Sequence, residues 1–117
     1  MKKLFIAAFM LVSSFGTNVM ADGHAIKMGI ILGFTGPIES LTPAMAGSAE
    51  LAFKEASDSG SLLGGKKIEV VRADSTCVDS AAATAAAEGV ISQGVAAIMG
   101  ADCSGVTGAI ASNVAVP

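Results

Sequence analysis

The most constraining feature of this sequence is a short apolar stretch whose second half contains no polar side chain. It runs from Ile26 to Leu32, and Gly33 ends it. A strand with apolar side chains on both faces must be covered on both sides, which is the condition of a strand inside a parallel sheet. Two further strand candidates follow at residues 67–72 and 95–99. The sequence therefore predicts a parallel sheet.

Helical patterns separate these strands. A helix is expected over residues 43–59 with Thr42 as its N-cap, a second over residues 81–92, and a third from near Ser104. The alternation of strand and helix predicts an α/β fold, a three-layer arrangement of a parallel sheet with helices on both faces. Residues 113–117 are expected to enter a further strand.

The first of these helices has one apolar face and one expected ion pair. Glu50 and Lys54 are four residues apart in the favourable order, so they are expected to pair on the outer face. The apolar face recurs at steps of three and four residues and consists of Met45, Ala49, Ala52, Phe53 and Ala56.

Composition and charge exclude several classes of protein. The chain has 117 residues, a formal net charge of -3 at pH 7, and neither Trp nor Tyr. An acidic chain with few aromatic residues does not suit nucleic acid, which attracts clustered cations and stacking rings. A hydrophobic fraction of 52% is too high for a disordered chain. The single histidine, His24, and two distant cysteines do not give the ligand spacing of a zinc site, so we expect no metal and no cofactor.

The first 21 residues have the pattern of a cleaved export signal. Two lysines precede an apolar run, Leu4 to Val12, which is too short for a membrane span of about 20 residues. Cleavage after Ala21 leaves residues 22–25 as a linker and residues 26–117 as the folded part. We therefore expect a protein exported to the periplasm, with no stable membrane insertion once the signal is removed.

The chain contains two cysteines, Cys77 and Cys103. In an oxidising compartment an even count favours a disulfide, and only one pairing within the chain is available. Bridged Cα atoms lie about 4.4–6.8 Å apart, so this bond is expected to draw together the loops after the second and third strands.

Nucleotide-binding and catalytic motifs are each incomplete. The glycines after the first strand lack the GxGxxG spacing. Gly100 and Gly105 match the glycines of a phosphate loop, but Val106 stands where that loop needs Lys. Cys103 and Ser104 have no neighbouring histidine to serve as a base. We therefore expect no enzymatic activity.

A binding edge is the remaining interpretation. Ligands of parallel sheets bind beyond the carboxyl ends of the strands, where the loops 33–42, 73–79 and 100–104 are expected. Ser104 stands at an expected helix start, where free N–H groups and the helix dipole attract an anion. Two interpretations stay open: Ser104 donates its hydroxyl to a carboxylate, or it only caps its own helix.

Four short motifs follow the export signal in order: Thr35-Gly36-Pro37, residues 63–69 (LGGKKIE), residues 74–79 (DSTCVD) and residues 100–105 (GADCSG). In this order and spacing, residues 26–117 resemble the leucine-isoleucine-valine-type substrate-binding proteins of ATP-binding-cassette (ABC) importers. These proteins have the type 1 periplasmic binding fold. The resemblance implies two α/β lobes with the ligand in the cleft between them. Family members are several hundred residues long, so it also implies that this chain holds an incomplete first lobe.

The resemblance assigns roles to individual residues. Cys77 and Cys103 match the disulfide of the family, and Ser104 matches the serine that holds the α-carboxylate of the ligand. Leu41 falls near a position where amino-acid-binding members often carry an aromatic side chain. The candidate ligand-binding residues are therefore Ser104, Cys103, Leu41, Gly105 and Thr107.

The function implied by the resemblance is that of an exported substrate-binding component of an ABC importer. Its ligands would be branched-chain amino acids or related small amides and carboxylates, delivered to a membrane permease. One alternative is a ligand-sensing domain of the same fold in a signalling receptor. An exported thiol enzyme is a third interpretation, and it predicts a free reactive cysteine.

Overall fold

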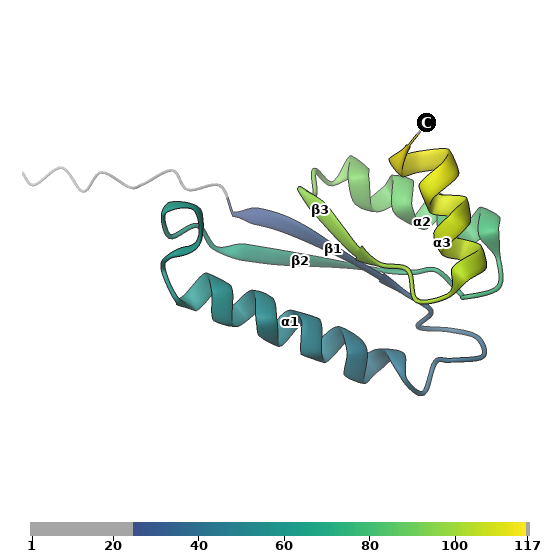
Figure 1. The fold of residues 1–117 in the computed structure, drawn as a ribbon, viewed down its shortest axis with the longest axis horizontal. Coiled ribbons are helices and arrows are strands. Elements are labelled where there is room, and N and C mark those ends of the chain that lie inside the picture. The colour runs from purple at the N-terminus through teal and green to yellow at the C-terminus, as the bar shows by residue number, and fades with distance from the viewer. Residues whose placement is uncertain (1–24, 117) are drawn as a thin grey trace, which may run out of the picture.

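The computed structural model describes residues 25–116, in which strands and helices alternate (Figure 1). The expected export signal, residues 1–21, lies outside these residues. The strands are β1 (Ile26–Leu32), β2 (Ile68–Asp74) and β3 (Ala97–Gly100), and the helices are α1 (Thr42–Asp58), α2 (Ser80–Ser92) and α3 (Ser104–Ile110). A 3-10 turn, Leu62–Gly64, follows α1, and a π-helical turn, Ala111–Ala115, extends α3.

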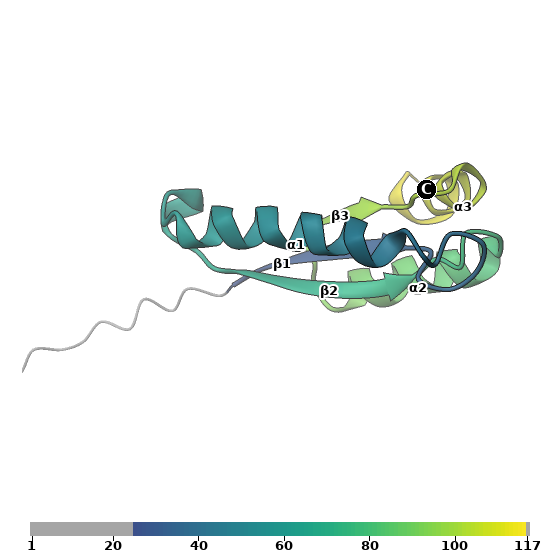
Figure 2. The same cartoon turned by 90° about the horizontal axis from the view of Figure 1, so that it is seen from below.

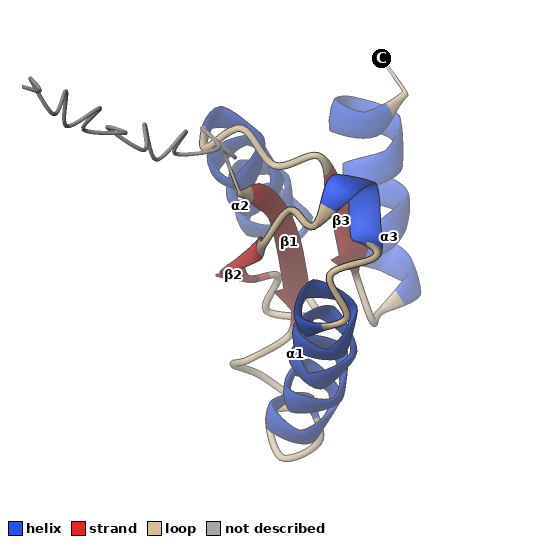
Figure 3. Ribbon diagram, turned by 90° about the vertical axis from the view of Figure 1, so that its left-hand side faces the viewer, coloured by secondary structure: helices blue, strands red, loops and turns tan. Residues whose placement is uncertain are grey.

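The three strands form one parallel sheet in the order β2-β1-β3, with β1 at its centre. Ile30, Ile31 and Leu32 of β1 are almost completely buried, as the apolar run predicts for a strand covered on both faces. Figure 3 shows α1 on one side of the sheet and α2 and α3 on the other. The predicted α/β fold with a parallel sheet and helices on both faces is confirmed.

Alternate residues of β1 pack into two separate hydrophobic cores, one on each face of the sheet. Ile30 and Leu32 pack against Ala46 of α1, while Ile31 packs against Ala87 and Val90 of α2. This division follows from the two-residue period of a strand, which sends successive side chains to opposite faces. The central strand thus holds both helical layers, and it fixes where each loop leaves the sheet.

The strand boundaries differ slightly from the predicted ones. β2 continues through Ala73 and Asp74, because its pairing with β1 extends to the register Leu32 with Asp74. β3 begins at Ala97, not at residue 95. The strand entry expected at residues 113–117 is wrong for the described part, since residues 111–115 continue α3 as a π-helical turn and Val114 packs against the core beneath α2.

The start of α1 also differs from the prediction. Thr42 is the first residue of the helix and not its N-cap, which is Leu41. The Thr42 side chain is buried, and its hydroxyl donates to the backbone oxygens of Gly33 at 3.1 Å and Glu39 at 3.4 Å. Its role is therefore to join the helix to the preceding loop.

The predicted apolar face of α1 is confirmed in part, since Ala49 and Phe53 pack against the core. Ala46 and Ser57 are buried, whereas Met45 is 42% exposed and Ala52 is exposed. Ser57 is tolerated inside because its hydroxyl accepts a hydrogen bond from the Ile68 N–H at 3.2 Å. The helix thus lies with its Ser57 side toward the start of β2.

The expected pair between Glu50 and Lys54 is wrong. Glu50 instead accepts two hydrogen bonds from the Arg72 guanidinium, at 2.5 and 2.7 Å, and Lys54 pairs with Asp58. Arg72 lies on β2 and also sits over the Phe34 ring, 5.5 Å from its centroid. The forked guanidinium matches both carboxylate oxygens, so a pair between α1 and β2 replaces the expected pair within the helix.

The disulfide between Cys77 and Cys103 is present, and its Cα atoms are 5.2 Å apart. It joins the loop after β2 to the loop after β3, as predicted. None of the helices within residues 25–116 has the length and apolar character that a membrane crossing requires.

Removal of the disulfide is expected to destabilise the protein by about 3 kcal/mol, because the bond closes a loop between residues 26 apart. Urea unfolding of a variant with both Cys77→Ser and Cys103→Ser checks this against the wild type. Circular dichroism is the suitable probe, since the chain has no Trp or Tyr. Reductant should lower the midpoint of the wild type and leave that of the variant unchanged. An unchanged wild-type midpoint would contradict the prediction.

Glu50→Gln is expected to cause a small, pH-dependent loss of stability. The hydrogen bond from Arg72 lowers the pKa of Glu50 from its ordinary value of 4.5. The ionised pair therefore stabilises the fold above pH 4.5, and this contribution disappears as the pH falls through the lowered pKa. Urea midpoints should differ between wild type and variant at pH 7 and converge in acid. The exposed Glu55→Gln on the same helix is the control and should show no such difference.

Candidate functional site

The loops that follow the three strands gather at one end of the sheet (Figure 2). They comprise residues 33–41 after β1, 75–79 after β2 and 101–103 after β3. In a parallel sheet this is the carboxyl edge, where ligands of α/β proteins bind. Of the candidate residues, Leu41 and Cys103 lie within these loops, and Ser104, Gly105 and Thr107 lie in α3.

Gly33 is the point at which all three loops meet. Its N–H donates to both carboxylate oxygens of Asp102, at 3.2 and 3.0 Å, and its carbonyl accepts from the Thr42 hydroxyl. It also lies against Cys77, since a Cβ atom at Gly33 would stand 3.1 Å from the Cβ of Cys77. The disulfide then continues from Cys77 to Cys103. The three loops are therefore joined into one unit at this edge.

A second carboxylate, Asp74 at the end of β2, holds the middle of the loop after β1. It accepts hydrogen bonds from the Thr35 hydroxyl at 2.5 Å, the Thr35 N–H at 3.3 Å and the Thr76 N–H at 2.8 Å. Burial raises the pKa of Asp74, but these hydrogen bonds outweigh it and hold the pKa below its ordinary value. Asp74 is thus an ionised structural group, occupied by the loops that it joins.

Gly36 makes the contact between these two loops possible. Its φ is +95°, in the left-handed region that favours glycine, and a Cβ atom there would stand 2.5 Å from the Thr76 carbonyl oxygen. The Thr35-Gly36-Pro37 motif therefore lies directly against the loop that carries Cys77.

Ser104 is the first residue of α3, and its side chain is exposed. The N-cap of α3 is Cys103, which makes no side-chain capping bond, so Ser104 does not cap the helix. Gly105 is also exposed, and a Cβ atom there would meet nothing within 4 Å. The start of α3 therefore presents a hydroxyl and open backbone to the surroundings.

The other candidate residues are placed differently. The Thr107 hydroxyl donates to the carbonyl oxygens of Ala101 and Cys103, both at 2.9 Å, so it shapes the turn before α3. Cys103 is half-buried and its sulfur is in the disulfide. Leu41 is 59% exposed and immediately precedes α1. Leu41 precedes α1 and Ser104 begins α3, and these two helices cover opposite faces of the sheet (Figure 3).

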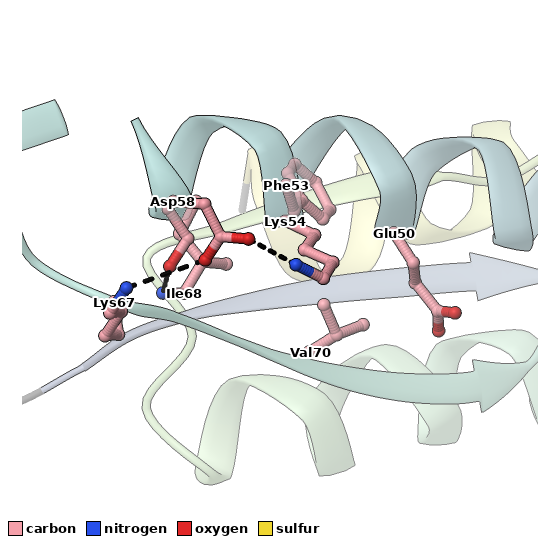
Figure 4. A pocket seen from close by; sticks show the side chains of 8 residues that line it. Glu50, Phe53, Lys54, Asp58, Lys67, Ile68 and Val70 are labelled. Atoms are coloured by element: carbon pink, nitrogen blue, oxygen red, sulfur yellow. Dashed lines mark hydrogen bonds and ion pairs between the residues drawn. The ribbon is translucent and has the colours of Figure 1, made fainter. Parts of the chain in front are cut away.

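Two hollows in the described part of the chain lie away from Ser104 and Leu41. The larger, of about 410 Å³, lies between α1 and the start of β2, at the opposite end of the sheet. Figure 4 shows Asp58 there between Lys54 and Lys67, so the charged groups of this hollow neutralise one another. The smaller, of about 160 Å³, lies between β3 and α3 and includes Thr107. Of the candidate residues, Thr107 therefore lines the smaller hollow, whereas Ser104 and Leu41 line neither.

Sequence reasoning missed the two carboxylates that organise the edge, Asp74 and Asp102. Both are acidic residues at or just beyond the end of a parallel strand, opposite a glycine-containing loop. That pattern is a usable signal, because the backbone N–H groups beyond a strand end lack ladder partners and need acceptors. Among residues 25–116, no group of three or more His, Cys, Asp or Glu side chains is arranged to hold a metal ion.

Comparison with known proteins gives a consistent result. A family model described as periplasmic binding protein matches residues 25–116. Among solved structures, the branched-chain amino acid transporter substrate binding protein LivJ from Streptococcus pneumoniae str. Canada MDR_19A, in complex with isoleucine, is similar, with 30% sequence identity and a TM-score of 0.55. The match covers 79% of this chain and 26% of LivJ. A search of curated proteins found no match.

The family match covers the entire described segment, and the fold agrees with it. Parallel strands, helices on both faces and loops gathered at the carboxyl edge are present in the matched residues. The chain spans about a quarter of the length of LivJ. By the extent of this match, the chain belongs to the periplasmic binding protein family.

Proposed function

We propose that this chain is the first-lobe part of an exported substrate-binding component of an ABC importer, and that it binds a small amino acid or a related amide or carboxylate. The observation that carries the proposal is the exposed Ser104 at the start of α3, in a chain 30% identical to a LivJ that holds isoleucine. Family members are binding proteins, so the proposed role is recognition without catalysis, and delivery to a membrane permease is part of the proposal.

In the proposed mode, the start of α3 receives the carboxylate of the ligand. The first amides of a helix have no carbonyl one turn earlier to accept from them, and in α3 these belong to Ser104, Gly105 and Val106. The Thr107 N–H, by contrast, already donates to the Cys103 carbonyl at 2.9 Å. The Ser104 hydroxyl is a further donor beside the free amides. Because Gly105 has no side chain, a ligand can approach the backbone there closely.

The surroundings of Ser104 favour a ligand with a single carboxylate. The loops 33–41, 75–79 and 101–103 contain Glu39, Asp79 and Asp102 but neither Lys, Arg nor His. The Arg72 guanidinium, which sits over Phe34, is already paired with Glu50. A second negative charge on the ligand would therefore find no unpaired cation in these loops and would be repelled by their acids. Leu41, exposed on the other flank, is the apolar group proposed to contact the hydrocarbon part of the ligand.

Export to the periplasm is the corresponding proposal for localisation. The family to which the chain belongs is described as periplasmic, and residues 1–21 have the sequence pattern of an export signal. The disulfide between Cys77 and Cys103 fits this compartment, because disulfides persist where the environment is oxidising.

Ser104→Ala is expected to weaken isoleucine binding about tenfold or more, because a hydrogen bond to a charged group is worth about 1.5–3 kcal/mol. Titration of isoleucine into the isotope-labelled chain, followed by NMR, measures this and suits a weak site. Ser112→Ala is the matched control, since Ser112 is exposed at the far end of the same helical segment. Equal affinity in the wild type and Ser104→Ala would contradict the proposed mode.

Isoleucine is expected to bind more tightly than glutamate, since the extra carboxylate of glutamate meets acids and no unpaired cation in the loops of this edge. The same titration with both amino acids checks the order. Tighter binding of glutamate would show that the charge of the edge does not set the ligand class.

A further inference from the structure

One side chain links the loop that carries Ser104 to the loop that leads to Leu41. The Asp102 carboxylate accepts from the Gly33 N–H with both oxygens, across 69 positions of sequence. Asp102 stands two residues before Ser104, and Gly33 is buried directly after β1. Hydrogen bonds to an ionised acceptor are stronger than those between neutral groups. This contact therefore attaches the loop after β3 directly to the loop after β1.

The attachment begins where the backbone ladder ends. The last register pair between β1 and β3 is Ile31 with Gly100, and Gly33 and Asp102 each lie two residues beyond it. Past that pair, the backbone of β3 turns toward α3 and no longer offers carbonyl groups to β1. The Asp102 carboxylate accepts from the Gly33 N–H in place of a backbone carbonyl, so it extends the connection between the two chain segments beyond the last register pair.

Gly33 also contacts the flank of the edge on which α1 begins. Its carbonyl accepts from the hydroxyl of Thr42, which is fully buried and directly follows Leu41. A short series of contacts therefore runs from the Ser104 loop through Asp102 and Gly33 to Thr42, the chain neighbour of Leu41. The disulfide gives a second, indirect connection, since Cys103 is bound to Cys77, which lies against Gly33. The Asp102 carboxylate is the direct hydrogen-bonded contact between the two loops.

We propose that Asp102 is a positioning residue that fixes Ser104 relative to Leu41. Its consequence for ligand binding rests on the proposed function, because Ser104 is the group through which it acts. Both oxygens of Asp102 accept from the Gly33 N–H, so its proposed role is to hold the two loops together. Loss of the carboxylate frees the turn before α3 from β1.

Hydrogen exchange of the ligand-free chain tests the positioning role directly. The Gly33 N–H reports the attachment, and the Thr107 N–H, which donates to the Cys103 carbonyl, reports the first turn of α3. In Asp102→Ala both amides should exchange at least tenfold faster than in the wild type. Asp102→Asn keeps one acceptor oxygen and should restore most of the protection. Glu39→Gln removes an exposed charge from the same edge and should change neither amide.

Isoleucine binding tests the consequence through a double-mutant cycle. Asp102→Ala should weaken binding about tenfold, and Asp102→Asn should return it to within about threefold of the wild type. In a chain that already carries Ser104→Ala, the further change Asp102→Ala should cost less than twofold, because Asp102 acts through Ser104. Urea midpoints of all variants show whether each remains folded at the assay temperature.

The outcomes separate this inference from the proposed function. Unchanged exchange of Thr107 in Asp102→Ala would overturn the positioning role, whatever isoleucine does. Additive losses in the cycle would overturn the action through Ser104. A wild type that binds no isoleucine would instead refute the proposed function, and the exchange rates would still decide whether Asp102 holds the edge.

Discussion

The close contact of three loops at Gly33 is the constraint on which the carboxyl edge depends. Gly33 is bonded through its N–H to Asp102 and through its carbonyl to Thr42, and Cys77 lies against its Cα. A side chain at this point would have to displace Cys77, and with it one end of the disulfide. Because Gly33 follows the buried central strand directly, the core fixes the point at which the three loops meet.

Side chains continue the sheet beyond its ladders on both sides of β1. Asp74 on β2 holds Thr35, and Asp102 after β3 holds Gly33, so each neighbouring strand supplies one carboxylate to the same loop. These acids are used for structure, since their oxygens are occupied by N–H and hydroxyl donors. The groups left exposed at the start of α3 are neutral donors, the Ser104 hydroxyl and the helix amides.

Local patterns in the sequence predict the strands, the helices and the disulfide, but they do not predict side-chain contacts between elements that are far apart in the sequence. The apolar run 26–32 predicts the central strand, and the two cysteines predict the disulfide. Each of these signals can be read from a few residues without knowledge of the tertiary structure. The four-residue spacing within α1 predicts a pair between Glu50 and Lys54. In the structure the planar guanidinium of Arg72, on β2, donates to both oxygens of Glu50 instead. The role of Asp102 is not predicted from local sequence for the same reason, because its partner, Gly33, lies 69 positions away.

The order of the carboxyl edge in the ligand-free chain lowers the entropy cost of ligand binding. The disulfide and Asp102 order the turn before α3 when the chain folds, so a ligand does not have to order it on binding. Solvent is the remaining limit. Ser104 and Gly105 are exposed, so a bond to a ligand carboxylate there replaces a bond to water, and only the net difference, about 1.5–3 kcal/mol, contributes to binding. A second surface that covers the edge and excludes water would strengthen the same contacts, since charge-assisted hydrogen bonds gain as the surroundings become less polar.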